Sequence, residues 1–334
     1  MPPRVRVTGL VAAPYTPMLP AGASGCAAVD LGSIAAHARE LAAQGVRWAF
    51  ICGSTGEGPT LSVSERCAVA EAWAAAAAAE PAADRLRIIV HVGAESLADT
   101  LALAAHAQAL AAAPGGGAVA AVGVVPPTYN KPAGVAAVVD LLASIAAAAP
   151  ALALYYYHIP IKTAVHISCP ALLAALHAPA GAARVPTFAG IKFTDFDLHA
   201  FATCVAFAGG AYDCLSGRDE ALLGFLAMGG VGAVGSTYNY QGREYNALIA
   251  AHARGDAAEA LRLQRLTQAS VDLLLQPDAY GPRVNVGKAL MELRLGGKHV
   301  GPPRFPSLPM ADDAKERLRA DAEAAGFFAG LQAK

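Results

Sequence analysis

The stretch TFAGIKFT, from Thr187 to Thr194, shows the pattern that decides the fold: a strand-forming apolar run with polar side chains near its carboxyl end. Seven other runs along the chain are also strand-forming, and helical stretches separate them. The eight predicted strands are VTGLVAAP (7–14), VRWAFIC (46–52), RIIVHVG (87–93), AVAAVGVV (118–125), ALALYYYHI (151–159), FAGIKFT (188–194), AYDCLSG (211–217) and VGAVGSTY (231–238). Strands that alternate with helices in this way predict a parallel sheet covered by helices.

The helical stretches include SIAAHARELAAQ (33–44), ERCAVAEAWAAAAA (65–78), LADTLALAAHAQAL (97–110) and EALLGFLAMG (220–229). Ser62 and Glu65 have the spacing of a capping box, which marks a helix start. Eight strand-helix units that end near residue 253 predict an α/β fold, a closed (β/α)8 TIM barrel, whose usual length is about 250 residues. An open doubly wound sheet is the competing fold, but no GxGxxG follows the first strand and no P-loop is present.

The chain beyond the barrel has a different pattern. Helical stretches at 257–276, 284–295 and 312–326 are separated by Pro and Gly, and no flexible Gly/Ser linker precedes them. We therefore expect residues 1–254 to form the barrel that carries the active site. Residues 255–334 are expected to form a C-terminal helical extension packed on the barrel.

Composition limits the function. Of the 334 residues 55% are hydrophobic and the net charge is -1, so we expect a folded protein with a small-molecule substrate and no nucleic-acid partner. The six cysteines lack CxxC spacing, which indicates reduced thiols and a cytoplasmic location. The first 18 residues do not resemble a signal peptide, and the alanine-rich stretches are too short and too close to charges to span a membrane.

Polar residues that could do chemistry follow five of the predicted strands, and the carboxyl ends of barrel strands meet at one mouth. They are Gly53 to Glu57, Tyr157, Lys192 with Thr194, Gly217 with Asp219 and Glu220, and Gly235 with Ser236. Side chains alternate between the two faces of a strand, so Lys192 and Thr194 should point into the barrel while Ile191 and Phe193 pack against helices. Tyr155 and Tyr157 should likewise point inward.

Lys192 is the candidate nucleophile. A buried ammonium is costly unless it is paired or loses its proton, and lysines of this kind form Schiff bases with carbonyl substrates. Each signal also has a structural alternative: Lys192 could extend its charge to solvent from a strand end, and Tyr157 could be a core tyrosine. The GSTGE segment could be an ordinary turn, and Asp219 and Glu220 could stabilise a helix N-terminus.

Four segments together, GSTGE, YHIP, GIKFT and GSTYN, make the sequence similar to the pyruvate-dependent class I aldolases, the family of N-acetylneuraminate lyase and dihydrodipicolinate synthase. The similarity extends roughly from Gly9 to Pro306. LSVSER, YYYHIP, AVGSTYNY and VGPPR resemble the lyase branch. The resemblance implies a lyase that cleaves N-acetylneuraminate, a sialic acid, to N-acetylmannosamine and pyruvate without a cofactor or metal, through a covalent imine on Lys192. It also implies a homotetramer.

The same resemblance assigns roles to the residues. It implies that Tyr157 relays a proton, with Thr55 beside it, and that Ser54 and Thr55 hold the substrate carboxylate. The remaining positions that match the sugar-binding set of the lyases are Thr194, Gly217, Asp219, Glu220, Gly235 and Ser236.

Two residues depart from the lyase pattern. Lys162 stands where the lyases carry an apolar residue and the synthases an arginine that binds a second carboxylate. Tyr129, in PPTYNKP, resembles the synthase tyrosine that reaches into a neighbouring subunit's site, although it could be an ordinary loop residue. Both are candidate substrate-binding residues. They keep open a synthase-like condensation of pyruvate with aspartate semialdehyde, or an aldolase for another 2-keto-3-deoxy sugar acid.

Two other classes of function remain as hypotheses. A metal-dependent aldolase would need His and carboxylate ligands at the strand ends, and His91 and His158 lie near such ends without close partners in the sequence. A catalytically silent barrel that serves as a binding module is the other. The joint presence of Lys192, Tyr157 and the GSTGE loop argues against it.

Overall fold

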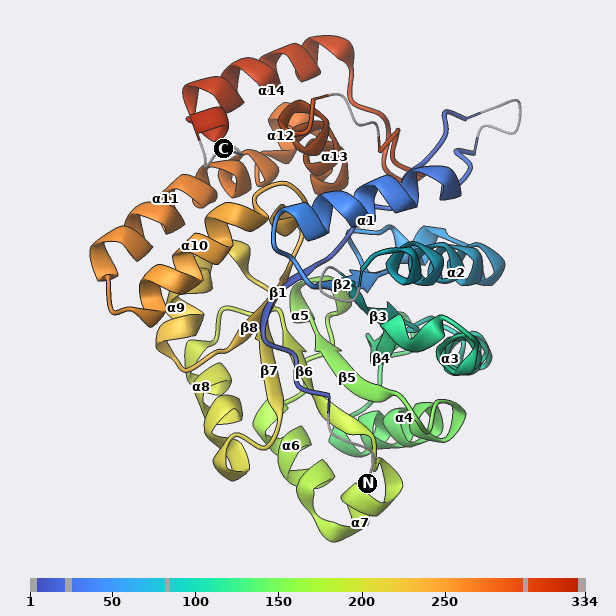
Figure 1. Cartoon of the computed structure of the whole chain (residues 1–334). Coiled ribbons are helices and arrows are strands. Elements are labelled where there is room, and N and C mark those ends of the chain that lie inside the picture. Colours follow the sequence, from blue (N-terminus) through green and yellow to red (C-terminus); the bar gives the residue numbers. More distant parts are fainter. Residues whose placement is uncertain (1–4, 22–25, 82–84, 297–299, 330–334) are drawn as a thin grey trace.

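Eight parallel strands close into a barrel in which each strand pairs with the next along the chain and the last pairs with the first (Figure 1). A computed structural model of the chain describes residues 5–21, 26–81, 85–296 and 300–329. The strands are β1 (Gly9–Ala12), β2 (Trp48–Ile51), β3 (Arg87–His91), β4 (Val119–Val124), β5 (Ala153–His158), β6 (Phe188–Phe193), β7 (Asp213–Ser216) and β8 (Gly232–Gly235). The predicted barrel is confirmed, although each strand is shorter than the run that predicted it.

Helices surround this barrel. They are α1 (Ile34–Ala43), α2 (Val63–Ala79), α3 (Leu97–Ala112), α4 (Val135–Ala148), α5 (Pro160–Thr163), α6 (Cys169–His177), α7 (Pro179–Arg184), α8 (Leu198–Ala206), α9 (Leu222–Ala227) and α10 (Gly242–Ala253). The predicted capping box is present at α2: the Ser62 hydroxyl accepts from the Glu65 N–H, and the Glu65 carboxylate accepts from the Ser62 N–H. None of the helices in the described ranges has the length and apolar character that crossing a membrane requires.

The C-terminal extension consists of α11 (Ala257–Leu274), α12 (Pro277–Tyr280), α13 (Arg283–Arg294) and α14 (Asp312–Ala324). Figure 1 shows these helices in orange and red, gathered beside α10 and α1. They share a buried cluster with the barrel, in which Tyr15 and Tyr240 meet Leu273, Val286 and Leu290. Residues 1–4 and 330–334, at the outer ends of the two predicted regions, lie outside the described residues.

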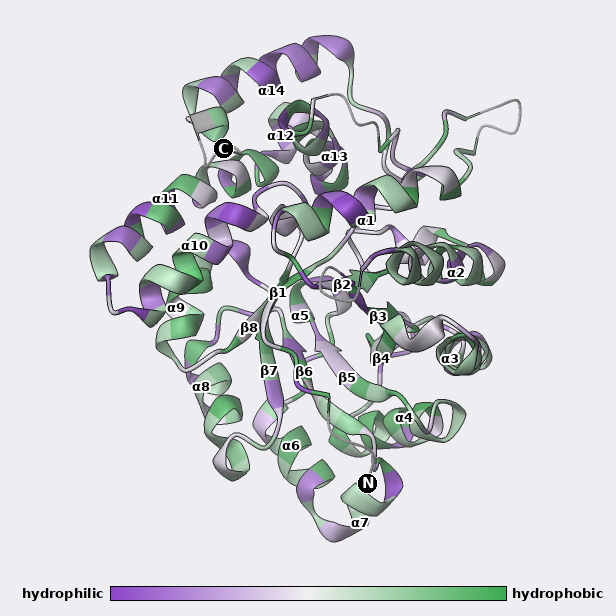
Figure 2. Ribbon diagram, viewed as in Figure 1, coloured by the Kyte–Doolittle hydropathy of each residue, from purple (hydrophilic) through white to green (hydrophobic). Residues whose placement is uncertain are grey.

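The strands separate two apolar cores, as their period-two alternation predicts. Ile191 and Phe193 belong to the core between the sheet and the helices, whereas Tyr155 and Tyr157 belong to the core inside the barrel. Figure 2 shows the contrast between the largely hydrophobic α4 and α6 and the hydrophilic α14. The membership of Tyr155 and Tyr157 in the core inside the barrel confirms their predicted inward positions.

A polar cluster around Asp213 lies at the amino-terminal end of the barrel. Asp213 Oδ2 accepts a hydrogen bond from the Tyr155 hydroxyl at 2.7 Å and another from the Val7 N–H at 3.0 Å. Arg6 Nε lies 3.1 Å from Asp213 Oδ1. Asp213 is therefore buried with its charge paired, and we refer to this cluster as the barrel floor.

Candidate active site

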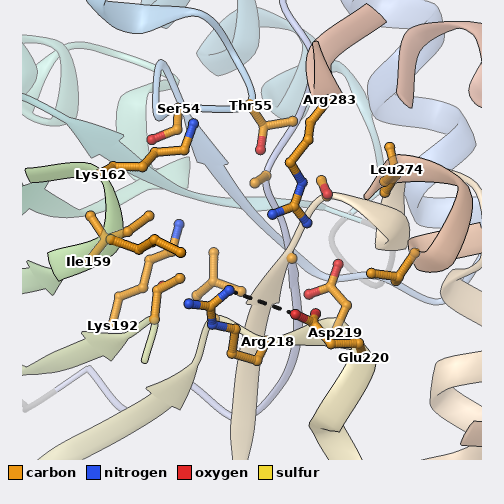
Figure 3. Close-up of a pocket in the computed structure, with 18 of the residues that line it drawn as sticks. Ser54, Thr55, Ile159, Lys162, Lys192, Arg218, Asp219, Glu220, Leu274 and Arg283 are labelled. Carbon is orange, nitrogen blue, oxygen red and sulfur yellow. Dashed lines mark ion pairs between the residues drawn. The ribbon is translucent and has the colours of Figure 1, made fainter. Parts of the chain in front are cut away.

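A pocket of ≈ 850 Å³, including its open mouth, lies at the carboxyl ends of the strands. This is the end at which TIM barrels carry their active sites. Its lining brings together nearly all the predicted site residues, several of which are labelled in Figure 3: Lys192, Tyr157, Ser54, Thr55, Thr194, Gly217, Asp219, Glu220, Gly235, Ser236 and Lys162. Segments from residue 54 to residue 236 therefore converge on one site.

Lys192 lies at the bottom of the pocket and is only 4% exposed. Its Nζ is 4.1 Å from the centre of the Phe50 ring and 3.9 Å from the centre of the Tyr157 ring. Burial lowers the pKa of this amine below its ordinary value of 10.5, and the interaction with Tyr157 opposes that shift without cancelling it. The fraction of neutral amine, the nucleophilic form, is therefore raised.

Tyr157 is held opposite Lys192 by the pairing of β5 with β6, in which the two residues are direct partners. The Tyr157 side chain has polar interactions with Ser54 and with Lys192. Burial raises the pKa of Tyr157, but the charge of Lys192 and these polar interactions lower it more, so that it lies below 10.0. A phenol placed in this way can give and take a proton within the pocket.

Ser54 and Thr55 lie in the loop that joins β2 to α2, and both are partly exposed to the pocket. The Thr16 hydroxyl donates to the Gly56 carbonyl at 2.6 Å and fixes the far side of the loop. The Ser54 side chain interacts with Tyr157, as described above. The loop thus places two hydroxyl-bearing residues in the same pocket lining as the lysine and the tyrosine.

Asp219 and Glu220 begin a short 3-10 helix, Asp219–Ala221, on the other side of the pocket. Asp219 Oδ2 accepts from the Thr237 N–H at 3.0 Å and from the Thr237 hydroxyl at 2.7 Å. Burial raises the pKa of Glu220 above its ordinary value. The acidic pair therefore lies both at a helix N-terminus and in the pocket lining, and its role in binding sugar hydroxyls stays a prediction.

Two predicted glycines are required by close packing in this region. A Cβ on Gly235 would lie 1.9 Å from Asp219 Oδ1, and a Cβ on Gly217 would lie 1.8 Å from Thr194 Oγ1. Either substitution would displace a neighbour that lines the pocket. These glycines therefore shape the cavity through their lack of a side chain.

The structure separates the two residues that depart from the lyase pattern. Lys162 lies on α5 in the pocket lining, exposed, and its charge acts on both Tyr157 and Lys192. Tyr129 is 86% exposed and does not belong to the pocket lining formed by the described residues. Its predicted role in a neighbouring subunit stays a prediction.

Several lining residues were not predicted from the sequence. Tyr15 follows β1, and Arg218 stands between Gly217 and Asp219. Four others come from the C-terminal extension: Val271, Leu274, Arg283 and Val284. Arg218 is 6% exposed, its guanidinium lies 4.0 Å from the centre of the Phe196 ring, and its Nη1 lies 3.7 Å from Glu220 Oε1. The position of Arg218 at the end of β7 was the one feature of the sequence that could have predicted its place in the pocket. No feature of the sequence indicated that the extension lines the pocket.

The two histidines considered as metal ligands both contact other protein groups. His91 is buried, its Nδ1 donates to the Cys52 carbonyl at 3.1 Å, and its Nε2 accepts from the Val125 N–H. His158 Nε2 lies 3.6 Å from Asp195 Oδ2. Across the residues that the structure describes, no three His, Cys, Asp or Glu side chains gather as a metal site would require.

The chain is similar to known proteins over nearly its whole length. The sequence model of the dihydrodipicolinate synthetase family matches residues 6–325. N-acetylneuraminate lyase of Sus scrofa is 38% identical over 328 residues, which cover 95% of this chain and 93% of that protein. The structure of Proteus mirabilis N-acetylneuraminate lyase superimposes with a TM-score of 0.84 at 35% identity, covering 97% of this chain and 100% of that one. The corresponding Aliivibrio salmonicida structure gives 0.85 at 34% identity, covering 98% and 99%.

Proposed function

Because the chain belongs to the dihydrodipicolinate synthetase family, we propose that it is a Schiff-base lyase that cleaves N-acetylneuraminate to N-acetylmannosamine and pyruvate. The observation that carries this proposal is the buried amine of Lys192, directly opposite Tyr157 at the bottom of a polar pocket. The near full-length similarity to proteins named N-acetylneuraminate lyase supports the choice of substrate.

The first half of the proposed reaction forms the imine. The neutral Lys192 amine attacks the keto carbon of the open-chain sugar acid, and loss of water gives a protonated imine. Ser54 and Thr55, through hydroxyl and backbone N–H groups, hold the substrate carboxylate beside this carbon. The positive imine can then accept the electron pair of the bond to be broken.

The second half breaks the bond between carbons 3 and 4. Tyr157, with Thr55 beside it in the relay, takes the proton of the hydroxyl on carbon 4 as that oxygen becomes the aldehyde, and the electron pair of the bond passes to the imine as an enamine. Protonation of carbon 3 and hydrolysis release pyruvate and restore the amine. The polar groups around Asp219, Glu220, Thr194 and Ser236 would accept and donate hydrogen bonds to the hydroxylated tail.

Trapping tests the proposal directly. Borohydride added with pyruvate should reduce the imine and leave a covalent mass on the peptide that contains Lys192. Lys192→Ala should lose both the adduct and pyruvate release from N-acetylneuraminate, whereas Lys315→Ala, on exposed α14, should keep both. An adduct on another peptide, or full turnover by Lys192→Ala, would show that the proposed nucleophile is wrong.

A second candidate substrate has one observation in its favour, the position of Lys162 in the pocket lining. A cation there could bind the second carboxylate of a substrate such as aspartate semialdehyde. Pyruvate with a panel of sugar aldehydes and aspartate semialdehyde, tested on the unmodified chain and on Lys162→Leu, separates the two candidates. If Lys162→Leu loses activity with only one of these aldehydes, that aldehyde carries the group that Lys162 recognises.

Three further properties of the protein are proposed as well. We propose that the reaction needs no cofactor or metal, because the imine itself accepts the electrons; full activity in excess EDTA is expected, and loss of activity would contradict it. The four buried thiols of Cys52, Cys169, Cys204 and Cys214 fit a cytoplasmic location. A homotetramer is proposed from the family resemblance, and light scattering would test it.

A further inference from the structure

The carboxylate of Glu57, the last residue of the GSTGE loop, is buried against the C-terminal extension. Lys288 Nζ, on α13, lies 2.7 Å from Glu57 Oε1 as an ion pair, and the Arg304 N–H donates to Oε2 at 2.7 Å. The Glu57 and Lys288 side chains are 5% and 3% exposed. Lys288 also donates to the Pro302 carbonyl at 2.9 Å. We call Glu57, Lys288 and residues 302–304 the loop clamp.

The loop that the clamp holds has a backbone that needs external support. Cys52 and Glu57, which flank it, both have a φ of 56°, a left-handed conformation that non-glycine residues rarely adopt. Such conformations cost energy and persist where the surrounding structure enforces them. The Gly58 N–H donates to the Gly53 carbonyl at 3.0 Å and closes the loop. Ser54 and Thr55 lie between these constrained points.

Helix α13 contacts the site at further points on the same side. Arg283 lines the pocket, and Figure 3 shows it pointing into the cavity. A Cβ on Gly287 would lie 1.8 Å from the Tyr15 hydroxyl, so the helix backbone packs directly on a pocket residue. Residues 283 and 287 are four apart and share one face of the helix, and Lys288 directly follows Gly287. Helix α13 therefore contacts both the pocket and the clamp.

We propose that Glu57 and Lys288 are positioning residues for the Ser54–Thr55 loop, and that the C-terminal extension thereby sets the affinity of the pocket for the substrate carboxylate. This inference rests on the proposed function, in which Ser54 and Thr55 hold that carboxylate. Neither Glu57 nor Lys288 belongs to the pocket lining. They act through the conformation of the loop between Cys52 and Gly58.

The test measures pyruvate affinity by the concentration dependence of borohydride trapping. Lys288→Met leaves Glu57 buried without its ammonium, so the loop should shift and the apparent Kd for pyruvate should rise on the order of tenfold to a hundredfold, the range expected when a hydrogen bond to the substrate carboxylate is lost. The labelled fraction at saturating pyruvate should stay unchanged, because Lys192 itself is untouched. Lys315→Met, which breaks the exposed pair with Asp312 on α14, is the matched control and should leave the Kd unchanged.

A double variant distinguishes the clamp from a general loss of stability. Glu57→Gln keeps an acceptor for the Arg304 N–H, and Glu57→Gln combined with Lys288→Met removes both charges. If the two residues act together, the apparent Kd of the double variant for pyruvate is no higher than the higher of the two single-variant values. A Kd that stays at its original value while the melting temperature falls would overturn the proposal. Additive losses in the double variant would also overturn it.

A measurement on the unmodified chain keeps the proposal testable if the variants do not fold. Pyruvate with borohydride should slow amide hydrogen exchange in residues 53–57 and, through the clamp, at the Arg304 N–H, which donates to Glu57. Slowing confined to 53–57 would contradict the coupling. If pyruvate labels no lysine at all, the proposed function fails; if it labels Lys192 with the same Kd in the unmodified chain and every variant, only the clamp proposal fails.

Discussion

Two opposing influences act on the protonation of the Lys192 amine. Burial lowers its pKa, whereas Tyr157 beside it favours the charged form; burial dominates, so the pKa lies below 10.5. We predict that the rate of pyruvate trapping rises with pH and levels off below pH 10.5, because only the neutral amine attacks. Trapping reactions that are stopped at successive times, at a series of pH values, measure this rate. A rate that keeps rising past 10.5 would contradict the lowered pKa, and Lys315→Ala should give the same profile as the unmodified chain.

The hydroxyl of Tyr157 should matter for bond cleavage more than for imine formation. We predict that Tyr157→Phe lowers kcat by about 10²–10⁴-fold, the usual contribution of a positioned proton donor or acceptor. Trapping with pyruvate at saturation should still label Lys192, since the phenol is not the nucleophile. Steady-state release of pyruvate and mass spectrometry of the trapped chain measure the two effects. Tyr155→Phe, which removes an inward hydroxyl at the barrel floor, is the comparison and should leave chemistry at the mouth largely intact.

For individual residues, the sequence predicted the side-chain directions that follow from strand alternation. Lys192, Thr194 and Tyr157 point inward because side chains alternate along a strand, and this needs no knowledge of the rest of the fold. Arg283 could not be predicted in this way. Its place in the pocket depends on how a helix more than 40 residues beyond β8 packs across the mouth, and no local pattern encodes that packing.

Helix α2 contacts the C-terminal extension through the first turn of α2. Glu65 belongs to the capping box of α2 and also pairs with Arg304, whose Nη2 lies 2.8 Å from Glu65 Oε1. The hydrogen bonds from Arg304 are the main cause that lowers the pKa of Glu65 to about 2. A carboxylate whose folded pKa is lowered stabilises the fold above its unfolded pKa, and this stability is lost as pH falls towards the folded value.

We therefore predict that Glu65→Gln lowers the free energy of unfolding at neutral pH by about 1 kcal/mol, a modest value because Glu65 is partly exposed to screening solvent. The difference should be complete above about pH 4.5 and should vanish as pH approaches 2. Urea unfolding at pH 6, 4 and 3 measures it. Glu259→Gln, in the exposed pair with Arg262 on α11, should cause little change at any pH. A difference for Glu65→Gln that stays constant down to pH 2 would contradict the assigned cause.

The extension illustrates which elements a sequence can predict. The stretches 257–276, 284–295 and 312–326 agree with α11, α13 and α14 to within two residues, because each has a helical pattern bounded by Pro or Gly. The short α12 and the short helices α5 and α7 were not predicted. Helices of four to six residues have too few positions to show a period of 3.6, and tertiary contacts decide them.

For the whole molecule, the barrel and the extension share one buried cluster and one pocket. Tyr15 and Tyr240, from the barrel, pack among Leu273, Val286 and Leu290 of the extension. We predict that a chain ending at Arg254 does not fold to an active barrel, because it would expose this apolar cluster and lose the loop clamp. Circular dichroism, size-exclusion chromatography and pyruvate trapping on the shortened chain measure this. A monomeric, folded product that traps pyruvate with the original Kd would show that the barrel is independent.

The barrel floor and the pocket lie at opposite ends of the barrel. Asp213, with its partners Tyr155, Val7 and Arg6, occupies the amino-terminal end, and Lys192 lies deep in the pocket at the carboxyl ends of the strands. In the proposed reaction, the half of a split substrate that is bound covalently to Lys192 is the inner half, and the aldehyde is the outer one. We expect departure to follow that order, aldehyde first and pyruvate second. Added pyruvate should then compete with the sugar acid for the free enzyme, whereas added aldehyde should inhibit by reversing the cleavage.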